Sequence, residues 1–251
     1  MNLALALSDE GARVGLLDAD IYGPSAPMMM GVMGARPVSD DGRHTVNPVQ
    51  AHGIQLMSIG FLTDDDSPLI WRGAAASQML DQLMRQTRWA DLDYLVIDMP
   101  PGTGDLPLSL CQRAPLSGAV IVTTPQDVAL LDVIKGVRLF QKAGVPVLGA
   151  IENMAVHVCG QCGHVSHPFG QGGGERLNEA TGVPMLASMP LDRRLREQSD
   201  LGVPIVRSEP DGPMAQQYRA LARQLAAAMV QAQTDQAPAA TGLRIEVSRD
   251  T

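Results

Sequence analysis

The sequence predicts an α/β fold, in which a doubly wound, mostly parallel sheet carries helices on both of its faces. Short apolar runs that suit buried strands alternate along the 251 residues with longer segments of helical periodicity. Such alternation produces βαβ units and therefore a parallel sheet that is covered on both sides. Polar residues end or follow each apolar run, and this is where ligands bind in sheets of this kind.

Four apolar runs fit strands that are buried on both faces. Each is rich in Val, Ile and Leu without polar alternation, which is typical of parallel strands. They cover residues 13–18 (RVGLLD), 93–98 (DYLVID), 119–124 (AVIVTT) and 147–153 (VLGAIEN). Residues 38–60 alternate only weakly and contain Pro, His and Gly, so we expect an irregular excursion or a small hairpin there.

Helical patterns lie between and after these runs. Residues 2–10 are rich in good helix formers and precede Gly11, a residue type that commonly ends helices. Further helices are expected at residues 74–89, 127–143, 174–181 and 214–233, the last with an apolar stripe that suits packing on the core. We expect one domain over residues 1–233 and a mobile C-terminal tail over residues 234–251.

Composition limits the classes of partner. The formal net charge of −8 creates no field that would attract nucleic acid or an anionic membrane surface. No stretch approaches the roughly 20 apolar residues that a membrane helix requires. Three cysteines are too few for a secreted disulfide scaffold and suit a reducing compartment. We therefore expect a cytoplasmic protein that uses neither nucleic acid nor membrane as a partner.

Two acidic clusters follow predicted strands. Asp18 and Asp20, in LLDADIYGPS, could hold a hydrated Mg²⁺ and orient a water for attack on a phosphate. Asp98, in IDMPPGTGD, could bind Mg²⁺ through water, and Gly102 would let a backbone N–H approach a phosphate. Acids and glycines that merely shape turns are the alternative for each cluster alone. Together the two clusters favour a nucleotide.

A third cluster contains cysteine and histidine. Cys159 and Cys162 form a Cys-x-x-Cys pair near His164 and His167. Zinc sites and iron–sulfur clusters both usually take four protein ligands, so the two thiolates supply only half of a Cys₄ site. Three interpretations stay open from spacing: a local zinc site that includes both histidines, a cluster shared across a two-fold dimer, and a redox dithiol.

In their order and spacing, these segments resemble the Mrp/ApbC iron–sulfur carriers, which belong to the MinD-like branch of P-loop ATPases. The resemblance covers roughly residues 1–207 and rests on LLDADIYGPS, IDMPPGTGD, PLSGAVIVTTPQDVALL, Asn153-Met154 and Cys-x-x-Cys. It implies a P-loop NTPase-like fold. It also implies that Asp18 and Asp20 are switch I acids, with Asp20 positioning the attacking water, that Asp98 is the Walker B acid and that Gly102 is the switch II glycine.

The same resemblance assigns the remaining candidate residues. Asn153 would read the adenine edge, and the loop from Pro190 to Asp192 would close over the base. Cys159 and Cys162 would hold a [4Fe–4S] cluster between the subunits of a homodimer. The resemblance therefore favours the cluster over zinc at this pair. The implied function is an ATP-dependent carrier, using ATP and Mg²⁺, that transfers the cluster to apo-proteins. A zinc-binding, non-catalytic interaction protein and a MinD-like partitioning ATPase are the alternatives.

One element that the resemblance implies does not occur in the sequence. No G-x-x-x-x-G-K-[ST] loop, which cradles nucleotide phosphates, is found in the 251 residues. In the resembled family this Walker A loop stands just before the residues that match 2–7. We expect the loop and the first strand to be missing through truncation, because Asp18, Asp20 and Asp98 remain. The expected consequence is weak ATP binding by this chain.

Overall fold

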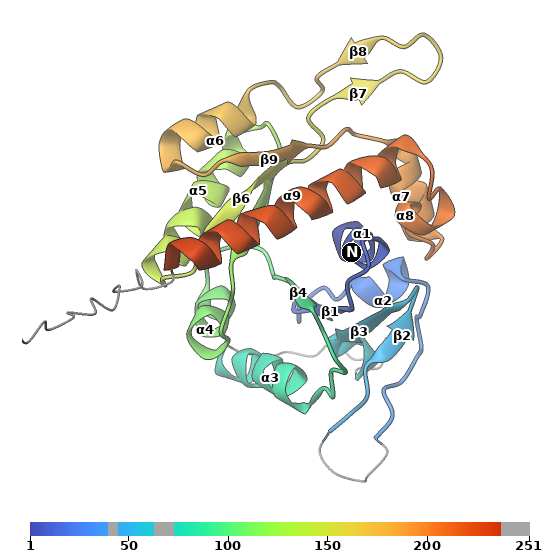
Figure 1. Ribbon diagram of the computed structural model, residues 1–251, viewed down its shortest axis with the longest axis vertical. Helices are drawn as coiled ribbons and strands as arrows, with labels where there is room; N and C mark the ends of the chain where they lie inside the picture. Colours follow the sequence, from blue (N-terminus) through green and yellow to red (C-terminus); the bar gives the residue numbers. More distant parts are fainter. Residues whose placement is uncertain (40–44, 63–72, 237–251) are drawn as a thin grey trace, which may run out of the picture.

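The computed structural model describes residues 1–39, 45–62 and 73–236 (Figure 1). The helices are α1 (Asn2–Asp9), α2 (Ala26–Met29), α3 (Gly73–Gln86), α4 (Asp105–Arg113), α5 (Asp127–Lys142), α6 (Gly173–Thr181), α7 (Arg193–Asp200), α8 (Ile205–Ser208) and α9 (Pro213–Gln236), with a short 3₁₀ helix η1 (Ile59–Phe61). The strands are β1 (Val14–Asp18), β2 (Val49–Ala51), β3 (Ile54–Ser58), β4 (Tyr94–Asp98), β5 (Ala119–Thr123), β6 (Val147–Glu152), β7 (His157–Val158), β8 (Val165–Ser166) and β9 (Met185–Ser188).

The main strands form two sheets that are mostly parallel. The first has the order β2-β3-β1-β4, in which β1 runs parallel to both β3 and β4 while β2 is antiparallel to β3. The second has the order β5-β6-β9 and is parallel throughout. The predicted parallel α/β architecture is therefore confirmed.

The hydrogen-bonded ladder is nevertheless divided between β4 and β5. Within the described ranges, β4 pairs only with β1 and β5 pairs only with β6. Apolar side chains on these two strands are consequently accessible: Leu95 of β4 is 37% exposed and Val122 of β5 is 57% exposed. The sheet expected from the sequence as one unit is thus built as two neighbouring parts.

Helices cover both faces of the second sheet. On one face, Val120 and Ile151 join a large apolar cluster that also includes side chains of α1, β1, β3 and α9. On the other face, Ile121 and Ala150 join a smaller cluster with side chains of α5 and α6. The long helix α9 crosses the molecule, contacting α1 beside the first sheet and β6 and β9 in the second (Figure 1). The predicted layers are confirmed.

Two segments can be compared with the sequence-based expectations. Residues 38–60 contain the hairpin β2–β3, which confirms the small hairpin over the irregular excursion, and β3 is in addition an internal strand with a buried Leu56. Helix α9 continues through Gln236, past the boundary predicted at residue 233. The rest of the expected tail, residues 237–251, lies outside the described residues. Across the described ranges, no helix is both long and apolar enough to span a bilayer.

Candidate nucleotide and metal-binding sites

The strand-end acids of the two clusters lie side by side. Asp18 and Asp98 are register partners at the ends of the parallel strands β1 and β4, and Ser58 is the partner of Asp18 at the end of β3. Asp18 is only 2% exposed, whereas Asp98 is exposed. Adjacent parallel strands end at the same edge of the sheet, so the fold itself brings these oxygen ligands together.

Asp18 is held by three donors. Its Oδ1 accepts from the Asp20 N–H at 3.3 Å, and its Oδ2 accepts from the Ala26 N–H at 3.2 Å and from the Ser58 hydroxyl at 3.0 Å. Burial raises the pKa of Asp18 above its ordinary value; the three hydrogen bonds oppose that rise, and the nearby Asp98 carboxylate adds to it. A cation held nearby would favour the charged form of this carboxylate.

Asp20 shapes the turn that follows β1. Its Oδ1 accepts from the backbone N–H groups of Tyr22 and Gly23, each at 3.2 Å. This is the turn-forming role that short acidic side chains commonly take. Asp20 also lines a cleft of about 600 Å³ with Pro100, Pro101 and neighbouring residues. The same side chain therefore fixes the turn and borders the cleft.

The loop after β4 separates two clefts. One side borders the cleft with Asp20, and the other borders a second cleft of about 380 Å³ that reaches across to β5 and α5. Gly102 has a φ of +91°, a conformation that residues with a Cβ adopt only with strain. The backbone conformation at position 102 therefore favours glycine over any other residue.

Helix α1 begins beside the same acids. Met1, which directly precedes α1, lies close to the carboxylates of Asp98 and Asp18. Positive partial charge at a helix N-terminus attracts anions such as phosphate. The start of α1 and the two strand-end acids therefore lie in one neighbourhood.

Asn153 and Pro190 lie just after β6 and β9 of the second sheet, and backbone hydrogen bonds join the segments that contain them. The Asn153 N–H donates to Thr123 O at 2.7 Å, at the carboxyl ends of β5 and β6. Immediately after Asn153, the segments following β6 and β9 bond through Ala155 N–H to Met189 O at 3.0 Å and through Leu191 N–H to Val156 O at 2.8 Å. The fold thus brings together two residues that are far apart in the sequence.

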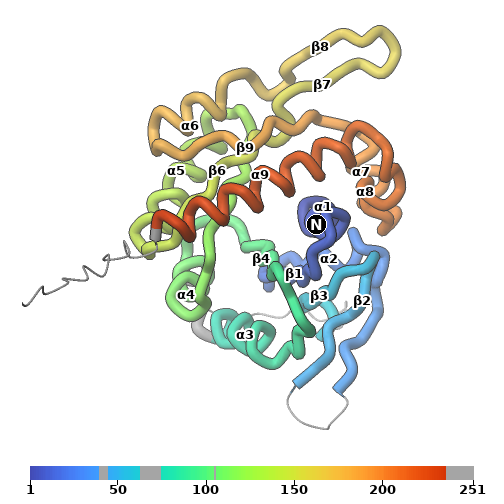
Figure 2. Tube along the Cα trace, in the orientation of Figure 1, coloured from blue at the N-terminus to red at the C-terminus, as the bar shows by residue number. Residues whose placement is uncertain are grey.

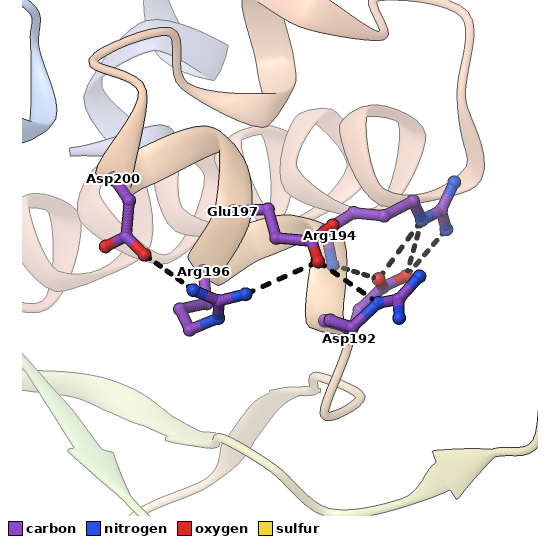
Figure 3. A network of polar contacts seen from close by, with 6 residues as sticks. Asp192, Arg194, Arg196, Glu197 and Asp200 are labelled. Carbon is purple, nitrogen blue, oxygen red and sulfur yellow. Dashed lines mark hydrogen bonds and ion pairs between the residues drawn. The ribbon is translucent and has the colours of Figure 1, made fainter.

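Asp192 is engaged with its own helix. Its Oδ1 caps α7 by accepting from the Arg194 N–H at 2.8 Å, and its Oδ2 lies 2.6 Å from Arg194 Nη2 (Figure 3). The Arg194 guanidinium lowers the pKa of Asp192 and also binds Glu209 at 2.8 Å. The carboxylate of Asp192 therefore fixes the start of α7, directly after Pro190 and Leu191.

The cysteine pair lies at the tip of a hairpin, β7–β8, which projects from the body of the molecule (Figure 1). The turn is fixed by the backbone, because Cys159 N–H donates to His164 O and Gly163 N–H donates to Cys159 O, both at 2.9 Å. Hydrogen bonds from the Cys162 N–H, the Gln161 N–H and the Cys162 side chain lower the pKa of the Cys159 thiol. A lowered thiol pKa favours the thiolate, which is the metal-binding form.

The histidines near the pair do not complete a site with it. Among the described residues, no three or more His, Cys, Asp or Glu side chains are grouped to hold a metal ion. His167 Nδ1 instead lies 3.0 Å from Ala155 O, at the base of the hairpin. The described part of the chain thus presents two thiols at this hairpin without a third or fourth ligand beside them.

Two buried polar residues beside these candidates were missed from the sequence. Ser58 is fully buried and bonds Asp18, but it lies in the segment that looked irregular. Glu152 is 8% exposed at the end of β6, directly before Asn153. The apolar run 147–151 indicated that Glu152 ends a strand, but nothing in the sequence singled it out as a site residue.

The α/β layers, the strand-end acids and the adjoining start of α1 define the class as a doubly wound α/β protein of P-loop NTPase type. The profile of the ParA-type family described as NUBPL iron-transfer P-loop NTPase matches residues 1–226. The chain belongs to this family, which confirms the resemblance found in the sequence.

Individual relatives support the same assignment. The chain is 58% identical over 222 residues, 88% of its length and 77% of the relative's, to the "Iron-sulfur cluster carrier protein" of Pseudomonas fragi. It is 53% identical over 227 residues to the protein of that name in Escherichia coli K12, covering 90% of this chain and 61% of the relative. The chain therefore spans about three-fifths of the length of the Escherichia coli relative.

Solved structures agree with the fold. A nucleotide-binding protein from Archaeoglobus fulgidus, solved in complex with ADP, superposes with a TM-score of 0.71 at 35% identity, covering 85% of this chain and 82% of that protein. The septum site-determining protein MinD from Pyrococcus horikoshii, solved with Mg-ADP, superposes with a TM-score of 0.62 at 22% identity, covering 89% and 87% of the two chains. At 22% identity, the likeness to MinD shows a shared fold and nothing about function.

Proposed function

We propose that this protein is an ATP-dependent carrier that holds an iron–sulfur cluster between two copies of the chain and transfers it to apo-proteins. The observation that carries the proposal is the projecting hairpin with its exposed Cys162 and a Cys159 whose thiol pKa is lowered. A two-fold axis near the tip would bring two such pairs together, and four thiolates are the ligand set of a [4Fe–4S] cluster.

Two further observations support this reading. The described residues provide no third or fourth ligand near the hairpin, which suits a shared site better than a local zinc site. The relatives named as cluster carriers support cargo of this kind over a zinc-binding interaction protein or a partitioning ATPase. The delivery of the cluster to apo-proteins is proposed from the names of the same relatives. The acceptor proteins would approach the hairpin from solvent.

Anaerobic reconstitution with iron and sulfide tests the proposal. We expect about four iron atoms per dimer, with cluster uptake and dimer formation rising together. Metal content and light scattering measure both quantities on the same sample. Uptake of one tightly bound zinc per monomer, with no iron-dependent dimer, would contradict the carrier function and favour the zinc alternative.

We also propose where the nucleotide binds. Asp18 and Asp98 would hold a hydrated Mg²⁺, Asp20 would position the attacking water, and Gly102 would let the backbone approach the γ-phosphate. The donor set fits, because Mg²⁺ in phosphate sites uses one or two carboxylates and retains several waters. Asn153 would read the adenine, and the loop from Pro190 to Asp192 would close over the base. The expectation that the Walker A loop is missing through truncation stays a prediction.

Asp20→Asn separates the two roles of Asp20. The amide oxygen can still accept from Tyr22 and Gly23, so stability should change little, whereas hydrolysis of saturating Mg-ATP should fall by about 100-fold. Hydrolysis and thermal unfolding are measured for this chain, and for the chain with its upstream genomic codons translated in frame. Equal hydrolysis rates for the variant and the wild type of a form that hydrolyses Mg-ATP would refute the role in positioning water.

A further inference from the structure

Glu152 is a buried carboxylate that the proposed nucleotide and cluster chemistry does not use. Its Oε1 accepts from the Gly174 N–H at 2.9 Å, at the first turn of α6, and its Oε2 lies 3.4 Å from the Ser188 hydroxyl at the end of β9. A charged acceptor on a helix N-terminus satisfies a donor that the helix itself leaves unpaired. One side chain thus joins two strand ends to the start of a helix.

The approach of α6 to these strand ends is unusually close. A Cβ placed on Gly173 would lie 2.6 Å from Pro125 Cα and 2.8 Å from Glu152 Oε1, so only glycine fits there. On the same helix, Arg176 donates to Pro125 O at 2.8 Å and pairs with Asp127 at 3.2 Å. The start of α6 is therefore fixed against the ends of β5 and β6 by polar contacts on both sides.

The residues between these two anchor points form the cysteine hairpin. The chain leaves β6 at Glu152, runs out through β7 and β8, and returns into α6, as the trace in Figure 2 shows. The Glu152–Gly174 bond therefore closes the base of an excursion of the chain that contains both Asn153 and the cysteine pair. A second contact, from His167 to Ala155 O, lies within the same base.

We propose that Glu152 is a positioning residue that fixes the base of the cysteine hairpin to the strand end at Asn153. By holding the start of α6, it would set the direction in which the two thiols project, so that two copies of the chain can share one cluster. The inference rests on the proposed function for the cluster, but the fixed hairpin base itself is independent of any ligand.

Three variants test the proposal in the full chain. Glu152→Ala removes the acceptor, Glu152→Gln retains an oxygen for the Gly174 N–H, and Glu179→Ala removes an exposed acid from the same helix as a matched control. We expect Glu152→Ala to speed hydrogen exchange of the Gly174 amide and of residues 157–166 by roughly tenfold, while the amides of β6 remain protected. Iron uptake on reconstitution should fall by at least half.

The conservative variant distinguishes positioning from general stability. Glu152→Gln should restore both slow exchange and iron uptake, and Glu179→Ala should behave as the wild type. Unchanged hairpin exchange in Glu152→Ala, or equal acceleration throughout β6, would overturn the proposal. If the wild type takes up no cluster, the proposed function fails instead, and hydrogen exchange alone then decides the role of Glu152.

Discussion

Replacing Gly202 with alanine should destabilise the protein by about 3–5 kcal/mol, because the new side chain has no space and the backbone is left-handed. Gly202 has a φ of +72°, and a Cβ there would overlap Gly31 Cα and lie 2.8 Å from Gly31 N. These contacts are with backbone, which cannot rotate away. The Gly202 carbonyl also lies 3.1 Å from His52 Nε2, so the shift would disturb a second contact.

Gly144→Ala is the matched control for this substitution. Gly144 has a φ of +73°, almost the same as Gly202, but a Cβ there would meet nothing within 4 Å. It should cost only the conformational term, about 1 kcal/mol. Urea unfolding of both variants measures the difference, and equal losses of unfolding free energy would show that the contact between Gly202 and Gly31 yields without cost.

Cys159→Ser should abolish cluster binding, with iron uptake after reconstitution at least tenfold below that of the wild type. Oxygen from serine is a poor ligand for a site built on soft thiolates, and two of the four proposed ligands are lost per dimer. The fold of the hairpin should survive, because its turn depends on the backbone atoms of Cys159, Gly163 and His164. Circular dichroism and the melting temperature should therefore match those of the wild type.

Cys111→Ser provides the matching control for the loss of a thiol. Cys111 lies on α4, is half-buried, and has a thiol pKa raised by burial, so it should remain protonated and inert. Iron uptake by this variant should equal that of the wild type. Full uptake by Cys159→Ser, or loss of uptake in Cys111→Ser, would show that the cluster is bound elsewhere.

Elements with a strong apolar period were predictable from the sequence. The runs that became β1, β4, β5 and β6 were recognised because strands buried on both faces need continuous apolar residues. Helix α7 was not recognised, and β3 was expected only as part of an irregular excursion or a small hairpin. None of the residues of α7 is buried, and its sequence has no apolar stripe that would indicate a helix. Strand β3 follows a stretch with Pro and Gly, which suggested irregular structure.

The candidate sites divide in a similar way. Asp18 and Asp98 were predictable because each ends an apolar run, and register in a parallel sheet then places them together. The role of Glu152 depends on Gly174, which is distant in sequence, and no local pattern reports such a contact. The engagement of Asp192 with Arg194 is local, but charge spacing alone does not show which way a carboxylate faces.

Helix α9 connects the two parts of the divided sheet by packing. The two sheets share no ladder in the described chain, yet α9 contacts α1 beside one and the strands of the other, and one apolar cluster includes side chains from both. Removal of α9 would expose apolar surface on both halves. The two halves should therefore unfold as one cooperative unit.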